Sequence, residues 1–201
     1  MILHLIRHGK TYANEQRLYC GQTDLPLSDT GAAEITQLAR AGIYPARDGL
    51  KMYTSGLFRT RQTLRLIYPD AAASPMPGLM EFHFGQFEMQ TYEQLRHNPD
   101  YIKWITDETG EVSCPGGENK TTYSKRVDAA LDWLISRNEP ALVICHGGVI
   151  THIMQRLFPD EPRHFYDWQS NPGEGYTILW DECSTPCFTE IAAKAPPARI
   201  P

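Results

Sequence analysis

Two short segments constrain the fold of this chain more than any other feature. Residues 2–6 and 141–145 are largely apolar runs, and each is closely followed by a histidine and a glycine, His8-Gly9 and His146-Gly147. Such runs are typical of buried strands, and the glycine marks where each strand ends. Ligands bind at the carboxyl edge of an open α/β sheet. The two segments therefore predict an α/β fold with an imidazole on each of two strands at that edge.

Helical and strand patterns alternate along the remaining chain. Apolar spacing predicts helices over 29–41, 56–67, 127–135 and 150–157. Ser28 and Ser55 are the predicted N-caps of the first two helices. Strands are predicted at 50–54, 176–180 and 188–191. Thr91 and Gln94 form a capping-box signature for a short helix, and a second short helix covers 101–105. This alternation predicts a three-layer α/β/α sandwich with a mostly parallel central sheet.

The length of 201 residues fits one domain. We expect residues 12–28 to form a functional loop, 71–78 a plain loop, 82–118 an insertion over the active site, and 195–201 a frayed tail. Tyr92, Tyr101 and Trp104 lie in that insertion, where they either stack on a substrate base or pack its two helices, and packing is the safer expectation.

Composition narrows the class of protein. The net charge of −5 disfavours nucleic acid as a partner, and the apolar start is too short for a signal peptide or a membrane span. The five cysteines are odd in number and scattered, without metal-ligand spacing. We therefore expect a cytoplasmic protein with reduced thiols, no bound metal and no membrane partner, and leave its oligomeric state open.

The basic residues near the two histidines point to phosphoryl chemistry. A neutral imidazole is a competent nucleophile, and His8 lies between Arg7, whose guanidinium matches phosphate oxygens, and a glycine that allows close approach. Arg59 lies in the first turn of a predicted helix, where backbone amides favour an anion. His146 reaches the same group from a neighbouring strand. Together these four side chains predict a pocket that stabilises a phosphoryl group.

A leaving alkoxide also needs a proton donor. Glu81 lies among apolar neighbours, which makes its carboxyl a candidate general acid, and His83 is the other candidate in the same segment. The residues alone leave the choice open.

Several motifs occur in a fixed order along the chain. They are RHGxTxxN at Arg7, His8, Gly9, Thr11 and Asn14; SxLxRxxQT at Ser55, Arg59, Gln62 and Thr63; ExxFGxxE at Glu81, Phe84, Gly85 and Glu88; PGGE at 115–118; and HGG at 146–148. In these motifs the chain resembles the histidine phosphatase superfamily, in the branch that contains the cofactor-dependent phosphoglycerate mutases.

The resemblance implies a phosphoglycerate mutase-like fold and a role for each matching residue. His8 would be the phosphorylated nucleophile, Arg7, Arg59 and His146 the rest of the phosphate pocket, and Glu81 the proton donor. Asn14, the turn at Cys20 and Gly21, and Gly147 would add phosphate or substrate contacts. No cofactor or metal is implied for a phosphatase of this kind.

Three functions remain open at this point. The chain is similar to the compact phosphatases of the family, and residues 19–27, 84–88 and 91–92 resemble those of α-ribazole phosphatases. A phosphomonoester hydrolase acting on a small phosphorylated metabolite such as α-ribazole 5′-phosphate is therefore the first hypothesis. A phosphoglycerate mutase is the alternative. A non-catalytic phospholigand-binding protein is the least favoured, because His8, Arg59, Glu81 and His146 are all present.

Overall fold

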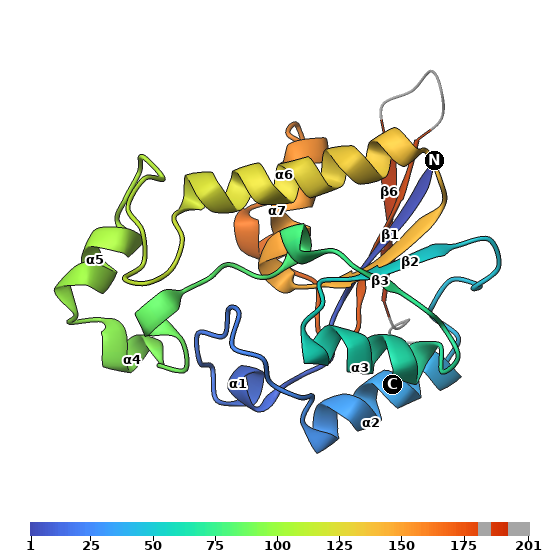
Figure 1. Cartoon of the computed structure of the whole chain (residues 1–201), viewed down its shortest axis with the longest axis horizontal. Coiled ribbons are helices and arrows are strands. Elements are labelled where there is room, and N and C mark those ends of the chain that lie inside the picture. The colour runs from blue at the N-terminus through green and yellow to red at the C-terminus, as the bar shows by residue number, and fades with distance from the viewer. Residues whose placement is uncertain (181–185, 193–201) are drawn as a thin grey trace, which may run out of the picture.

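The computed structural model describes residues 1–180 and 186–192. Its elements in chain order are β1 (Ile2–Arg7), α1 (Tyr12–Glu15), α2 (Asp29–Arg40), β2 (Lys51–Thr54), α3 (Phe58–Ile67), β3 (Ser74–Pro75), the 3₁₀ turns η1 (Pro77–Leu79) and η2 (Gly85–Phe87), α4 (Tyr92–Leu95), α5 (Pro99–Ile105), α6 (Lys120–Arg137), β4 (Ala141–Cys145), α7 (Gly147–Leu157), η3 (Phe165–Trp168), β5 (Gly175–Leu179) and β6 (Cys187–Ile191) (Figure 1). The predicted alternation of strands and helices is confirmed.

The sheet has six strands in the order β3-β2-β4-β1-β5-β6. The pairings β1–β4, β2–β4 and β2–β3 are parallel, whereas β1–β5 and β5–β6 are antiparallel. β1 and β4 are neighbours whose register ends with Arg7 opposite Cys145. The histidine after each strand therefore leaves the sheet at the same level.

Alternation along the strands decides which layer each side chain faces. Leu3 and Leu5 of β1 belong to the main core with α6 and α7, while Ile6 packs in a second core that includes Leu64 of α3. Figure 1 shows α6 on one side of the sheet and α2 with α3 on the other. Successive side chains along a strand point to opposite faces of the sheet. His8 therefore faces the α3 layer, as Ile6 does two residues earlier.

Two predicted helix caps are confirmed and one is wrong, while α6 and α7 begin at Lys120 and Gly147, earlier than the predicted 127 and 150. Ser28 caps α2 by accepting from the Gly31 amide, and Thr91 with Gln94 forms the capping box of α4. Ser55 does not cap α3: the residue at the cap position is Leu57, which has no side-chain capping bond. The hydroxyl of Ser55 is instead within hydrogen-bond distance of His146.

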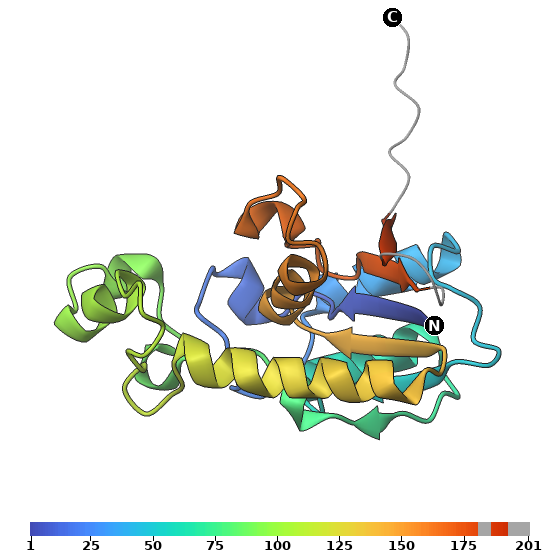
Figure 2. The ribbon, with the colours of Figure 1, turned by 90° about the horizontal axis from the view of Figure 1, so that it is seen from above.

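Two expectations about loops also change. Residues 12–28 begin with α1, which has its own capping box between Thr11 and Asn14, and residues 71–78 contain the short strand β3 and the start of η1. Figure 2 shows α4 and α5, drawn in green, beyond the end toward which the arrows of β1 and β4 point. The expected tail at 195–201 and most of the turn between β5 and β6 lie outside the described residues.

Candidate active site

The imidazole of His8 is buried and held in one tautomer. Its side chain is 6% exposed, and its Nδ1 lies 2.7 Å from the carbonyl oxygen of Gly9. Because a carbonyl only accepts, Nδ1 carries the proton and Nε2 keeps a lone pair. Burial, followed by the charges of Arg59 and Arg7, holds the pKa of His8 well below its ordinary value of 6.5. His8 is therefore neutral at physiological pH, with Nε2 available as a nucleophile.

His146 meets His8 from the neighbouring strand. Its ring is fully buried, and its centroid lies 5.1 Å from that of His8. Nε2 lies 2.8 Å from the Ser55 hydroxyl and Nδ1 lies 3.3 Å from Nη2 of Arg59. Since a guanidinium only donates, Nδ1 is the acceptor and Nε2 donates to Ser55. Burial and the charge of Arg59 lower the pKa of His146 well below 6.5.

Arg59 and Arg7 are two cations beside these rings with no carboxylate within 4.0 Å among the described residues, and the carboxylate of Glu81 acts on Arg7 from a longer distance. Arg59, on the first turn of α3, is 1% exposed and donates from Nε to Nε2 of His8 over 3.3 Å. Arg7 donates from Nη1 to the carbonyl of Ser170, while its buried Nε has no hydrogen-bond partner in the described chain. None of the ion pairs within 4.0 Å among the described residues includes either guanidinium. A buried cation without a counter-charge is costly, so this arrangement favours binding of an anion.

The turn after Cys20 supports Arg59. The carbonyl oxygens of Gly21 and Thr23 accept from its guanidinium at 2.6 and 2.9 Å. A Cβ on Gly21 would lie 2.0 Å from the carbonyl oxygen of Phe82, so only glycine fits the close approach there. The Cys20 thiol lies 3.8 Å from the Thr23 carbonyl, and burial raises its pKa. The structure thus shows this turn holding Arg59, which is a less direct role than the predicted phosphate contact.

Glu88 fixes the same turn from the other side. Its carboxylate accepts from the amides of Gln22 at 2.9 Å and Thr23 at 2.7 Å, from the Thr23 hydroxyl, and from the amide of Phe84 at 3.2 Å. Four donors on one carboxylate make it the organising centre of this turn. The sequence motif contained Glu88 but did not indicate this role.

Glu81 reaches the site through the start of α7. Its carboxylate accepts from the amide of Gly148 at 3.0 Å and from its own neighbour, the amide of Phe82, at 2.9 Å. A Cβ on Gly148 would lie 2.6 Å from Glu81 Oε1, so glycine is needed for this contact. Glu81 is therefore joined to the segment that carries His146. The backbone of His83, the other candidate, pairs with Glu118, and no contact of its ring with the site is seen in the described chain.

Asn14 and Gly147 have contacts that limit their roles. The side-chain oxygen of Asn14 accepts from the amide and hydroxyl of Thr11, which leaves its NH₂ group as the part able to donate to a substrate. Gly147 opens α7, and a Cβ there would lie 3.1 Å from Cζ of Arg7. Its lack of a side chain keeps the guanidinium in place.

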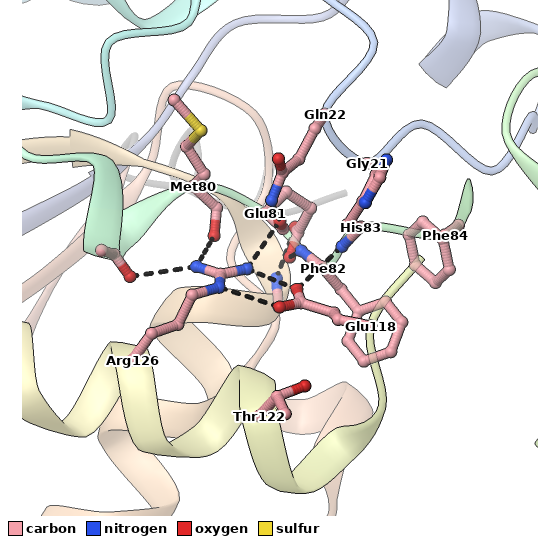
Figure 3. A network of polar contacts seen from close by, with 12 residues as sticks. Gly21, Gln22, Met80, Glu81, Phe82, His83, Phe84, Glu118, Thr122 and Arg126 are labelled. Carbon is pink, nitrogen blue, oxygen red and sulfur yellow. Dashed lines mark hydrogen bonds and ion pairs between the residues drawn. The ribbon is translucent and has the colours of Figure 1, made fainter. Parts of the chain in front are cut away.

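Two further residues support the site in ways that the sequence did not indicate: Thr63, named in a motif without a role, and Arg126, which no motif contained. Thr63 accepts from the Gly9 amide at 3.0 Å and so fixes the backbone after His8. Arg126, in the middle of α6, donates to the carbonyl of Glu81 at 2.9 Å (Figure 3). An arginine at this position of an amphipathic helix has no local pattern that separates it from a solvated surface residue.

The described residues contain neither a membrane-spanning helix nor a metal-binding cluster. No helix there is long and apolar enough to cross a membrane. No group of three or more His, Cys, Asp or Glu side chains there is arranged to hold a metal ion.

Comparisons with known proteins show the family of this chain. The family model of the histidine phosphatase superfamily (branch 1) matches residues 3–187. An adenosylcobalamin/α-ribazole phosphatase from Salmonella typhimurium is 31% identical over 163 residues, covering 78% of this chain and 79% of that protein. A probable phosphoglycerate mutase GpmB from Yersinia pestis is 29% identical, covering 77% and 74%. The crystal structure of a putative α-ribazole-5′-P phosphatase from Escherichia coli superimposes with a TM-score of 0.84 at 25% identity, covering 97% of each chain. This chain belongs to the histidine phosphatase superfamily, branch 1.

Proposed function

We propose that this phosphatase hydrolyses a small phosphomonoester through a phosphohistidine at Nε2 of His8. One observation carries the proposal: the neutral His8 ring presents Nε2 beside two guanidiniums that form no ion pair within 4.0 Å in the described chain. A phosphoryl group supplies the missing negative charge and the electrophile together.

We infer a role for each group from its contacts. Nε2 of His8 forms a bond to phosphorus as the ester P–O bond breaks, and the leaving oxygen takes a proton from the Glu81 carboxyl. Arg7, Arg59 and His146 stabilise the charge on the phosphoryl oxygens. The Glu81 carboxylate then accepts a proton from water, whose oxygen attacks phosphorus. The P–N bond breaks, releasing inorganic phosphate and restoring neutral His8.

The substrate we propose is α-ribazole 5′-phosphate. Support comes from the names of the Salmonella typhimurium relative and of the Escherichia coli structure. Of the three aromatic residues considered for stacking on a base, Tyr101 and Trp104 are buried, as expected for packing, whereas Tyr92 is 57% exposed with its ring edge-on to that of Tyr101. The location we propose is the cytoplasm. It is supported by the free thiols of the four described cysteines, Cys20, Cys114, Cys145 and Cys187.

Phosphate release from a panel of substrates tests the proposal. The panel holds α-ribazole 5′-phosphate, sugar phosphates, nucleotides, both phosphoglycerates and p-nitrophenyl phosphate, with His8→Ala as the control for contaminating activity. We expect selective hydrolysis of α-ribazole 5′-phosphate and none by His8→Ala. Even, weak activity over the panel would refute the substrate but keep the hydrolase. Transfer between phosphoglycerate isomers that needs bisphosphoglycerate, with poor hydrolysis of p-nitrophenyl phosphate, would establish the mutase alternative instead.

A further inference from the structure

We propose that Arg126 is a positioning residue for the proton donor, acting through the backbone of Glu81. The inference rests on the proposed function, in which Glu81 protonates the leaving oxygen. Figure 3 shows Arg126 reaching from α6 to the segment that carries Glu81, with Glu118 beside it.

Every N–H group of the Arg126 guanidinium has an acceptor. Nη1 donates to the carbonyls of Gly78 at 3.0 Å and Met80 at 2.6 Å, and Nη2 donates to the carbonyl of Glu81 at 2.9 Å. The remaining two donors, on Nε and Nη2, go to the two carboxylate oxygens of Glu118. Three carbonyls within four residues are thus held by one rigid planar group.

Glu118 forms a clamp together with Arg126 and extends the support of the backbone past Glu81. Its Oε1 accepts from the amide of His83 at 2.8 Å, and its own amide donates to the carbonyl of His83 at 3.0 Å. The backbone is therefore fixed on both sides of Glu81. The charge of Arg126 is compensated by Glu118, in contrast to Arg7 and Arg59, so Arg126 is not arranged to bind the phosphate.

Glu81 acts in both chemical steps, as the acid for the leaving oxygen and as the base for water, but only the first step enters kcat/KM once the leaving group has departed. Its carboxyl must keep its contact with the Gly148 amide and lie within hydrogen-bond reach of the leaving oxygen. A displacement of about 1 Å in such a group can cost up to about 100-fold in rate. A lysine at position 126 keeps the charge but has a single nitrogen, which cannot bridge three carbonyls and both oxygens of Glu118.

The test compares two leaving groups in the Arg126→Lys variant. An alkyl phosphate needs a proton in its transition state, whereas p-nitrophenolate leaves readily without one. We expect kcat/KM for the alkyl phosphate to fall at least about 10-fold and that for p-nitrophenyl phosphate to change less than about 2-fold. The ratio of the two rates, measured on one sample, does not depend on the fraction of folded protein. Glu118→Gln gives a second variant of the same clamp.

Three further variants make the result specific. Glu81→Gln should show the same selectivity, with a larger loss, and adding Arg126→Lys to it should not increase that loss. Arg156→Lys, at an arginine paired with Asp128 and Asp132 on the surface of α6 and α7, should change neither rate.

Each outcome separates the inference from the function on which it rests. Equal losses on both substrates in Arg126→Lys, or an added loss in the double variant, would overturn the positioning role while Glu81 remained the acid. If Glu81→Gln itself slowed both substrates equally, the proposed role of Glu81 and the inference would fail together.

Discussion

Because His8 and His146 are buried and neutral, the free energy of unfolding should fall in acid. Replacing His8 should remove one part of that fall. The folded state holds the pKa of His8 and of His146 well below 6.5, because both rings are buried beside Arg59. In the unfolded chain each imidazole returns to a pKa near 6.5. As pH falls below 6.5 the unfolded chain therefore binds protons that the folded chain does not bind.

The sign and size follow from linkage. A depressed pKa in the folded state means that stability is fully present above pH 6.5 and is lost as pH falls below it. At pH 5.5 each such histidine lowers the free energy of unfolding by about 1.4 kcal/mol relative to pH 8, provided that it stays neutral in the folded protein. Replacing His8 by glutamine should remove one of these contributions.

Urea unfolding at pH 8 and pH 5.5 measures the difference. The buffers must be free of phosphate, because a bound anion favours a charged imidazole. We expect the pH-dependent loss for His8→Gln to be smaller than for the unmodified protein by about 1.4 kcal/mol. Comparing losses cancels any pH-independent cost of the substitution and the contribution of His4, whose pKa burial also lowers. Identical losses in the two proteins would refute the neutral, buried state of His8.

Two other predictions concern the phosphate pocket. Glu88→Gln should loosen the turn that holds Arg59 and lower kcat/KM for alkyl and p-nitrophenyl phosphates alike, by about 10-fold or more. Steady-state kinetics on both substrates check this, and a loss confined to the alkyl phosphate would contradict it. Activity should be unchanged after dialysis against a chelator, because Arg7, Arg59 and His146 supply the positive charge; a loss restored by adding metal would show the opposite.

Local patterns predicted those parts of the structure that depend on local physics. The ends of β1 and β4, the cap at Ser28 and the capping box at Thr91 each depend on a few consecutive residues, and all are confirmed. The approach of His8 to His146 followed from expecting their strands to be near neighbours with a shared carboxyl edge. Ser55 was assigned wrongly because a serine before a helix has the same local pattern whether it caps that helix or contacts a distant histidine.

The supporting contacts could not be predicted in the same way. Arg126 reaches Glu81 across 45 residues and Glu88 reaches Thr23 across 65, so their partners are set by how loops cross the carboxyl edge of the sheet. Hydropathy and spacing describe neighbours along a helix or strand, and they carry no information on such crossings.

Two long-range clamps support different parts of the site: Glu88 holds the turn at residues 21–23, and Arg126 with Glu118 holds the backbone around Glu81. Glu88 fixes the turn whose carbonyls hold Arg59, and in the proposed mechanism Arg59 stabilises the phosphoryl group of every substrate. Arg126 acts on the backbone of Glu81, which affects kcat/KM only when the leaving oxygen needs a proton. Weakening the first clamp should therefore lower all rates together, while weakening the second should steepen the dependence of rate on the basicity of the leaving group. The two sets of contacts meet between Glu81 and Glu88, where Glu118 accepts from the amide of His83 and Glu88 from that of Phe84, and Gln22 contacts both sides. Their effects on the alkyl phosphate should therefore be coupled, and a double-mutant cycle of Glu88→Gln with Arg126→Lys measures the coupling.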